Sequence, residues 1–293
     1  MKNKWAGVLD IPEGQVGDYK IRHIKYPPNT TLETANMRCQ YIGGQKNHIL
    51  HFDDATTWHE LSYEGGVWMT DLPCEQAQHD SELGKLMDVV VHGATVLVGG
   101  LGLGYAVTQL CQHEKVEFVV CVEKSAEVIA LVKPHLNIPD TKLAIINQDL
   151  FDYLANIHVG PTDLMEPFDC AFYDIWQADN ENTFFNVVCK LRELSEHIVL
   201  DEYVVCWNED VMRGQLMFKM LGALNKPDTE LIERLSTPIP ETESHHIYYN
   251  WMNPFFQAIK NGQLSFPDAQ KIAGDYVRMW GREAFDDWWM DQL

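Results

Sequence analysis

The sequence predicts an α/β protein with a mostly parallel sheet flanked by helices and preceded by a small β subdomain. Three observations predict this fold. An apolar run at 94–98 leads into a glycine-rich turn and then into a helical pattern. Further apolar runs of strand length alternate with helical patterns through residue 205, as in βαβ units. Short β-prone runs separated by turn residues occupy 48–70, ahead of that core.

The N-terminal β subdomain is expected over residues 1–72. Strands are predicted at 19–25, 48–52, 57–62 and 67–70, with acidic and glycine-containing turns between them. A helix ending near Val91 is expected to follow and to open the core domain, 73–225. This helix carries four polar side chains at helical spacing: Glu75, Gln76, His79 and Asp80. They form either part of the wall of a site, where Glu75 would contact the substrate, or a solvated helix face.

Glycines stand at positions 99, 100, 102 and 104, in the turn after the first core strand. Glycine at such a turn allows the backbone to approach a bound ligand closely. The second core strand, 116–122, ends in Glu123, about twenty residues beyond the glycines, where a carboxylate suits the two hydroxyls of a ribose. The dinucleotide fingerprint G-x-G-x-x-G would need glycine at 105 or 107, where Tyr105 and Val107 stand, so an NAD site is disfavoured.

Acidic or polar residues also close the later strands. A helix capped by Ser125 leads to the third strand, 142–147, which ends at Gln148 and Asp149. The fourth strand, 168–173, ends at Asp174, and a fifth is expected over 196–200, after a helix at 182–191. Because the carboxyl ends of parallel strands form the ligand crevice of such sheets, these positions predict a nucleoside-type site.

The remainder comprises a helix at 208–224 and a mainly helical extension, 226–293, with an aromatic end. Those aromatic side chains either cap the core or contribute to a homodimer contact. His245 and His246 are adjacent on an extended stretch and would face opposite ways, which makes a poor metal pair. We therefore predict no metal.

Composition limits the partners. The net charge of −21 disfavours nucleic acid as a substrate. It either favours a small neutral or cationic molecule or serves only solubility. No run approaches the roughly 20 apolar residues of a membrane span, and the start of the chain shows no signal-peptide core. Seven scattered cysteines are typical of a reducing compartment. We expect a cytoplasmic protein with no membrane partner.

The order of the glycine segment 96–104, Glu123, Asp149 and Asp174 resembles the core of class I S-adenosylmethionine-dependent methyltransferases, which have a Rossmann-like fold. The β meander before it resembles, more narrowly, the spermidine synthase branch of that superfamily; the likeness covers roughly 48–205. It implies that Glu123 holds the ribose hydroxyls of the cofactor, and that Asp149, with Gln148 or Leu150 beside it, meets the adenine amino group. It also implies that three glycines pass under the methionyl part: Gly100, Gly102 and Gly104.

Two positions depart from the spermidine synthase pattern. Leu103 stands where that branch has an acid near the aminopropyl group, and Gln177 stands for the second acid of its catalytic loop. Loss of the first acid removes a like-charge penalty against the carboxylate of ordinary S-adenosylmethionine. The sequence therefore favours methyl transfer over aminopropyl transfer from the decarboxylated cofactor.

Asp174 is the predicted catalytic residue. Its carboxylate could accept a proton from the acceptor, orient the acceptor for attack on a sulfonium carbon, or only hydrogen-bond on the cofactor side. Trp176 beside it could stack on a cationic substrate or pack in the core, and Tyr173 could face either the cofactor or the core. The expected function is a small-molecule methyltransferase; the alternatives are a polyamine aminopropyltransferase and a non-catalytic binding protein that retains the fold.

Overall fold

The computed structural model describes residues 9–33, 49–157, 168–177, 183–199, 203–213, 224, 229–238 and 246–279. The chain forms two compact units. One comprises residues 1–177 and 191–207, and the other comprises 178–190 and 208–293. The expected division into 1–72, 73–225 and 226–293 stays a prediction.

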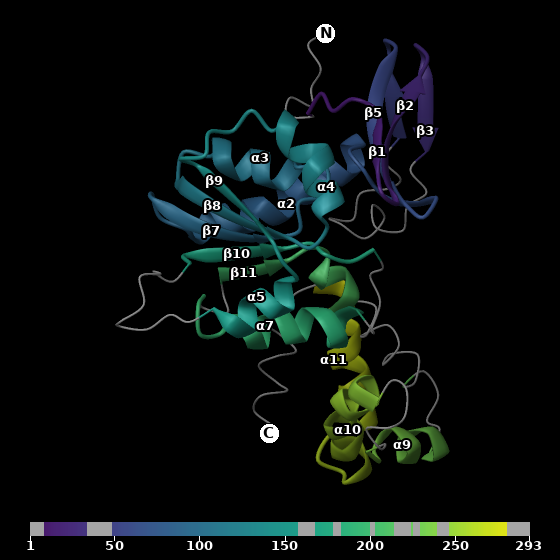
Figure 1. Ribbon diagram of the computed structural model, residues 1–293. Helices are drawn as coiled ribbons and strands as arrows, with labels where there is room; N and C mark the ends of the chain where they lie inside the picture. The colour runs from purple at the N-terminus through teal and green to yellow at the C-terminus, as the bar shows by residue number, and fades with distance from the viewer. Residues whose placement is uncertain are drawn as a thin grey trace. The chain divides into compact units, whose positions relative to one another are not determined.

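A five-stranded sheet is the centre of the first unit (Figure 1). Its strands are all parallel and lie in the order β11-β10-β7-β8-β9. The central strand is deeply buried, with Val96, Leu97 and Val98 all fully shielded from solvent. Burial on both faces explains why the core strands appear in the sequence as unbroken apolar runs. The strands are β7 (Ala94–Gly99), β8 (Val116–Glu123), β9 (Leu143–Asn147), β10 (Cys170–Tyr173) and β11 (Val204–Cys206).

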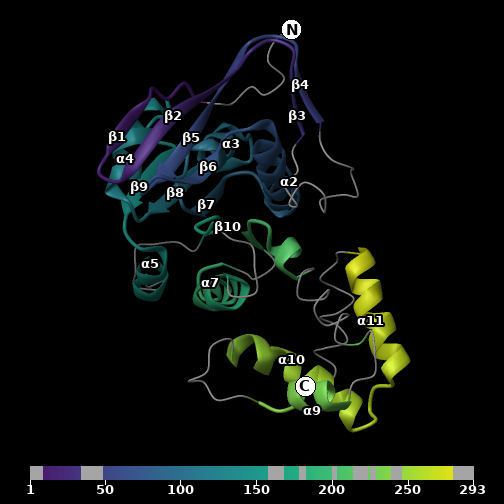
Figure 2. The ribbon, with the colours of Figure 1, turned by 90° about the vertical axis from the view of Figure 1, so that its right-hand side faces the viewer.

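Helices cover both faces of this sheet. Figures 1 and 2 show α2 (Pro73–Val89), α3 (Tyr105–Gln112) and α4 (Ala126–Val132) on one face. The same views place α5 (Leu150–Asn156) and α7 (Cys189–Ser195) on the other. The predicted N-cap of α4 is confirmed, because the Ser125 hydroxyl accepts a hydrogen bond from the Val128 amide at 3.1 Å. The predicted Rossmann-like α/β architecture is thus confirmed.

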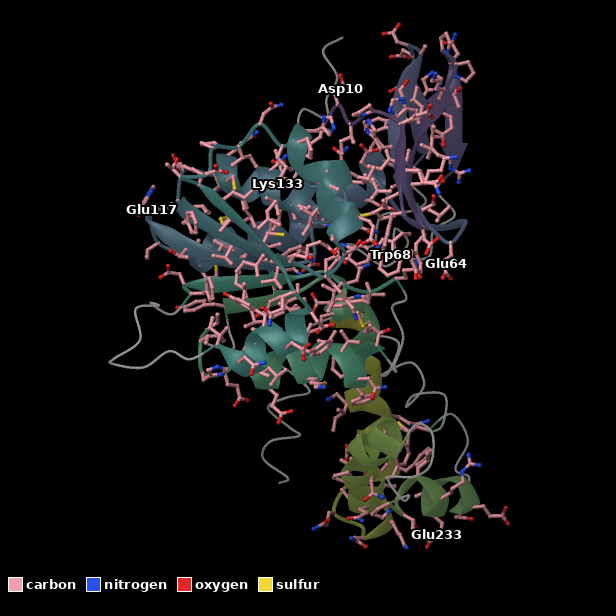
Figure 3. All side chains as sticks on the ribbon, viewed as in Figure 1. Asp10, Glu64, Trp68, Glu117, Lys133 and Glu233 are labelled. Carbon is pink, nitrogen blue, oxygen red and sulfur yellow. The ribbon has the colours of Figure 1, made fainter. Side chains whose placement is uncertain are left out.

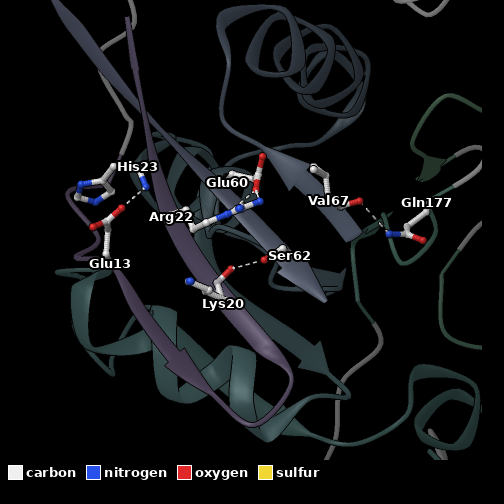
Figure 4. A network of polar contacts seen from close by, with 8 residues as sticks. All are labelled: Glu13, Lys20, Arg22, His23, Glu60, Ser62, Val67 and Gln177. Atoms are coloured by element: carbon white, nitrogen blue, oxygen red, sulfur yellow. Dashed lines mark hydrogen bonds and ion pairs between the residues drawn. The ribbon is translucent and has the colours of Figure 1, made fainter. Parts of the chain in front are cut away.

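The N-terminal β subdomain is also present, but the predicted meander is divided between two sheets. A four-stranded antiparallel sheet has the order β1-β2-β5-β6, and β3 pairs separately with β4. Contacts across the larger sheet include an Arg22–Glu60 ion pair and a hydrogen bond from the Ser62 hydroxyl to the Lys20 carbonyl (Figure 4). The strands are β1 (Gly14–Val16), β2 (Tyr19–Tyr26), β3 (Thr30–Glu33), β4 (Ile49–Phe52), β5 (Thr56–Tyr63) and β6 (Gly66–Thr70).

The fifth core strand lies later in the chain than predicted. The stretch 196–199 forms a turn after α7, in which the amides of Ile198 and Val199 both donate to the Ser195 carbonyl at 2.9 Å. The fifth strand of the sheet is β11, which pairs with β10. The prediction of a strand at 196–200 was therefore wrong over the described residues 196–199. Ile198 and Val199 are buried by this turn, and a short apolar run does not distinguish a buried turn from a strand.

The described part of the second unit is mainly helical. It contains α9 (Thr229–Leu235), α10 (His246–Lys260) and α11 (Phe266–Met279), with Met252, Phe255 and Phe256 buried. A π-helical turn, Phe184–Val188, replaces the first part of the helix predicted at 182–191. His245, most of the predicted helix 208–224 and the aromatic stretch after 279 lie outside the described residues. Among the described helices, none has both the length and the apolar character that a membrane crossing requires.

Candidate active site

The candidate site lies where the parallel strands of the first unit end. The chain order reverses at β7, whose neighbours are β8 on one side and β10 on the other, and ligands bind at such a switch point in open α/β sheets. The register places Gly99 opposite both Val122 and Tyr173. The residues that directly follow these three paired positions are therefore neighbours, as predicted: the glycine loop 100–104, Glu123 and Asp174.

The glycine loop is packed tightly against other parts of the chain. Gly100, Gly102 and Gly104 all have positive φ, at 94°, 50° and 78°. A Cβ on Gly100 would overlap the carbonyl oxygen of Asp174, and one on Gly102 would lie 2.6 Å from the sulfur of Met69. A Cβ on Gly104 would lie 2.7 Å from the side chain of Leu136. Contacts within the protein are thus sufficient to require glycine here, and the approach of a ligand to these glycines stays a prediction.

Glu123 is tied directly to this loop. One carboxylate oxygen accepts from the Leu101 amide at 2.8 Å, and the other accepts from the Ser125 amide at 2.7 Å. A carboxylate offers about four lone-pair sites, so two remain for further donors. Glu123 is only half-buried and can therefore be reached. Its position and chemistry suit the predicted ribose hydroxyls.

Asp149 and Leu150 follow β9 and begin α5. The Asp149 carboxylate caps the helix, accepting from the Phe151 amide at 2.9 Å, and pairs with Lys124 at 3.0 Å. Burial alone would raise the pKa of Asp149, but the bonds from Lys124 and the Phe151 amide outweigh it and lower the pKa. Leu150 is buried, and its side chain occupies the space where a Cβ on Gly99 would lie. Contact of Asp149 and Leu150 with an adenine ring stays a prediction.

Asp174 forms a hydrogen-bonded pair with His79 of α2. The His79 Nε2 lies 3.0 Å from the Asp174 Oδ2, and the His79 Nδ1 lies 2.9 Å from the carbonyl oxygen of Glu75. The His79 side chain is 6% exposed, whereas the Asp174 side chain is 18% exposed. The aspartate is therefore the member of this pair that a substrate can reach.

Aromatic rings enclose His79. Its imidazole stacks on Trp207 with ring centroids 5.6 Å apart, and Tyr105 and Phe172 contact it at 5.8 and 6.0 Å. The faces of aromatic rings attract cations, so this setting suits a protonated imidazole. Burial lowers the pKa of His79, but the hydrogen bond and charge of Asp174, together with the Glu75 carbonyl, raise it on balance.

This raised pKa predicts a pH dependence of stability. In the unfolded chain His79 should titrate near its ordinary value of 6.5, while the folded protein keeps the proton to higher pH. The stabilisation is complete below pH 6.5 and is lost as the pH rises through the folded pKa, at up to about 1.4 kcal/mol per pH unit. Urea unfolding from pH 6 to 9 should show this decline in the wild type and a shallower one in His79→Gln. Equal slopes in both proteins would contradict the assignment.

The polar face of α2 is not a simple solvated face. Gln76 is 1% exposed and donates to the Asp71 carbonyl at 2.7 Å, and a Glu75 carboxylate oxygen accepts from the Thr70 amide at 2.9 Å. Asp80 is exposed but accepts from the Tyr105 hydroxyl at 2.6 Å. The interpretation as a solvated face was therefore wrong for Gln76 and His79. Substrate contact by Glu75 stays a prediction.

The segment after β10 borders the N-terminal sheet. The Gln177 amide donates to the Val67 carbonyl of β6 at 3.3 Å (Figure 4). Trp176 is 8% exposed, and its indole N–H has no hydrogen-bond partner among the described residues. Tyr173 is fully buried, and its hydroxyl bonds to Ser195 of α7 at 2.8 Å. Tyr173 thus faces the core, which decides between its two predicted orientations.

Sequence reasoning does not find the partner of Asp174, His79, or the ring that stacks on it, Trp207. The sequence marks His79 only as one polar residue of a helix face, and it gives no signal for Trp207. His79 and Asp174 are 95 residues apart, and no local pattern joins them. The described residues contain no group of three or more His, Cys, Asp or Glu side chains placed to hold a metal ion.

No protein-family model matches the sequence, and no curated protein matches it. Among solved structures, a spermidine synthase in complex with the transition-state analogue AdoDATO is 15% identical, with a TM-score of 0.37, over 54% of this chain and 57% of its own. The spermidine synthase from Thermotoga maritima is 14% identical over the same shares, also with a TM-score of 0.37. Human methyltransferase-like protein 13 in complex with SAH is 15% identical over 43% of this chain and 58% of its own, with a TM-score of 0.32. This chain thus spans little more than half the length of these structures, and similarities this weak carry no conclusion about its function.

Proposed function

We propose that this protein is an S-adenosylmethionine-dependent transferase that moves a methyl group to a small acceptor at Asp174. The observation that carries this proposal is the direct contact between the glycine loop and the aspartate. The Asp174 amide donates to the Gly99 carbonyl at 3.0 Å, and Gly100 packs on the Asp174 carbonyl. A cofactor held on the loop would therefore present its reactive carbon beside the partly exposed carboxylate of Asp174.

The residues around the glycine loop fit this cofactor. Glu123 would hold the ribose hydroxyls with its two remaining lone-pair sites. The thioether of Met69 lies against Gly102, but it is the end of a flexible and only half-buried side chain, which can turn away. Leu103, which is 3% exposed, stands at the position where the spermidine synthase pattern has an acid. The absence of that acid supports methyl transfer over aminopropyl transfer.

S-adenosylmethionine, when bound, supplies an electrophilic methyl group on a sulfonium, whose sulfur keeps the electron pair of the broken S–C bond. Asp174 would accept the proton that an O–H or N–H acceptor releases as its lone pair forms the new bond to carbon. His79 would hold the carboxylate in one orientation during this step. The buried wall around His79 would exclude water from one side of the acceptor.

Calorimetric titration tests the proposal. We expect S-adenosylmethionine to bind more tightly than its decarboxylated form. Glu123→Ala should weaken binding roughly 10- to 100-fold, because a charged hydrogen-bond acceptor is lost. Glu117→Ala is the matched control, since Glu117 is an exposed acid near the other end of the same strand (Figure 3).

The other outcomes are equally informative. Tighter binding of the decarboxylated cofactor would favour the aminopropyltransferase, and binding of neither would leave the non-catalytic alternative. Equal losses in both variants would show that Glu123 has no specific role. The unfolding midpoint of Glu123→Ala should be measured alongside, because the substitution also removes the acceptor of the Leu101 and Ser125 amides.

A further inference from the structure

The hydrogen bonds of His79 fix the number of protons that the pair with Asp174 holds. The Glu75 carbonyl can only accept, so the Nδ1 of His79 carries a hydrogen. On the other side of the ring, Nε2 and the Asp174 Oδ2 are 3.0 Å apart. Two bare lone pairs would repel at this distance, so one more proton lies between them.

This proton sets the charge of the pair. With the proton on nitrogen, a +1 imidazolium faces a −1 carboxylate; with the proton on oxygen, both groups are neutral. The net charge is zero in either case. Of the acidic side chains next along α2, Glu75 accepts from the Thr70 amide and Asp80 accepts from the Tyr105 hydroxyl. These two donors are uncharged, and the negative charge of Glu75 also acts on His79 and raises the pKa of the imidazole. The ring contacts of the imidazole among the described residues are with the uncharged side chains of Trp207, Tyr105 and Phe172.

A lone aspartate at this position would attract a cationic amine, whereas a charge-compensated pair offers no net charge to it. We propose that His79 is a specificity-determining residue that makes the Asp174 site select uncharged O–H or N–H acceptors over cationic amines. The inference rests on the proposed function, because it places the acceptor at Asp174. The chain's overall charge of −21 does not reverse this preference, since exposed charges are screened beyond about 8 Å at physiological salt. The range of acceptors expected from composition, neutral or cationic, is thereby narrowed to neutral molecules.

The first test measures the proton directly. Protein labelled with ¹⁵N in histidine and ¹³C in the aspartate carboxyl should show, at pH 7, either an imidazolium with an ionised Asp174 or a neutral imidazole with a protonated Asp174. A neutral His79 beside an ionised Asp174 would overturn the proposal. This measurement needs neither cofactor nor acceptor, so it stands even if S-adenosylmethionine does not bind and the proposed function falls.

The second test measures selectivity with two probes of equal length, 1,4-diaminobutane and 1,4-butanediol. His79→Gln should leave Asp174 charged and uncompensated, and the diamine should then bind roughly tenfold or more tightly than to the wild type. The diol should bind both proteins alike. Calorimetric titration with and without S-adenosylhomocysteine gives both affinities.

A double variant separates charge from changes in shape. His79→Gln combined with Asp174→Asn has no charge at the pair, so the gain for the diamine should disappear. Persistence of the gain in the double variant, or equal diamine binding by the wild type and His79→Gln, would contradict the proposal. If His79→Gln does not fold, the magnetic resonance measurement on the wild type alone decides whether the charge of Asp174 is compensated.

Discussion

Gly100→Ala should lower the free energy of unfolding by about 3 kcal/mol, because two costs add. The backbone φ of 94° costs an L-residue roughly 1 kcal/mol. The new Cβ would overlap the Asp174 carbonyl oxygen, and relieving such an overlap inside a packed region costs roughly 2 kcal/mol more. Because the overlapping atom is backbone, the strain cannot be relieved by turning a side chain. Urea unfolding followed by circular dichroism measures the loss.

Gly65→Ala provides a matched control. Gly65 also has a positive φ, 82°, but a Cβ there would meet nothing within 4 Å. Gly65→Ala should therefore lower the free energy of unfolding only by the conformational cost, roughly 1 kcal/mol. Equal losses at both positions would show that the contact with Asp174 is not a source of strain. A larger loss at Gly100, accompanied by weaker cofactor binding, would link the loop to the placement of the Asp174 carboxylate.

The elements of the core could be predicted because their signals are local. An apolar run, a glycine turn and an acid at the next strand end lie within about thirty residues, and the parallel sheet brings such strand ends together wherever it forms. Glu123 and Asp174 could therefore be placed at one edge from the sequence alone. The N-cap of α4 was predictable for the same reason, since Ser125 and its bond partner Val128 are three residues apart.

The rest of the site depends on packing between distant segments. Met69 reaches Gly102 from an edge strand of the other sheet, next to a register irregularity between β5 and β6, and bulges of this kind redirect side chains. His79 meets Asp174 only because α2 packs beside β10 and β11. The failure at 196–200 has a different cause, since Ile198 and Val199 bury apolar surface in a turn as well as a strand would. Hydrophobic periodicity indicates which residues are buried, but it does not indicate which segment they pack against.

Asp174→Asn should nearly abolish methyl transfer while leaving the fold and cofactor binding intact. An asparagine can donate to the Nε2 of a neutral His79, so the buried hydrogen bond survives with no unpaired charge. It cannot accept a proton from the acceptor, and loss of a general base typically lowers the rate 10²- to 10⁴-fold. Release of S-adenosylhomocysteine over a panel of uncharged acceptors measures this rate in both proteins.

Asp169→Asn is the appropriate control for this loss. Asp169 directly precedes β10, at the opposite end of the strand from Asp174, and its carboxylate accepts from the Thr95 amide at 2.7 Å. Loss of this interaction should reduce stability slightly and leave the transfer rate unchanged, because catalytic groups of such sheets lie at the carboxyl ends of strands. If Asp174→Asn retains the wild-type rate, the aspartate serves only to hold His79 or the cofactor, and the proton must leave by another route. If the rate falls while cofactor affinity is unchanged, Asp174 acts on the acceptor, and His79 acts through it.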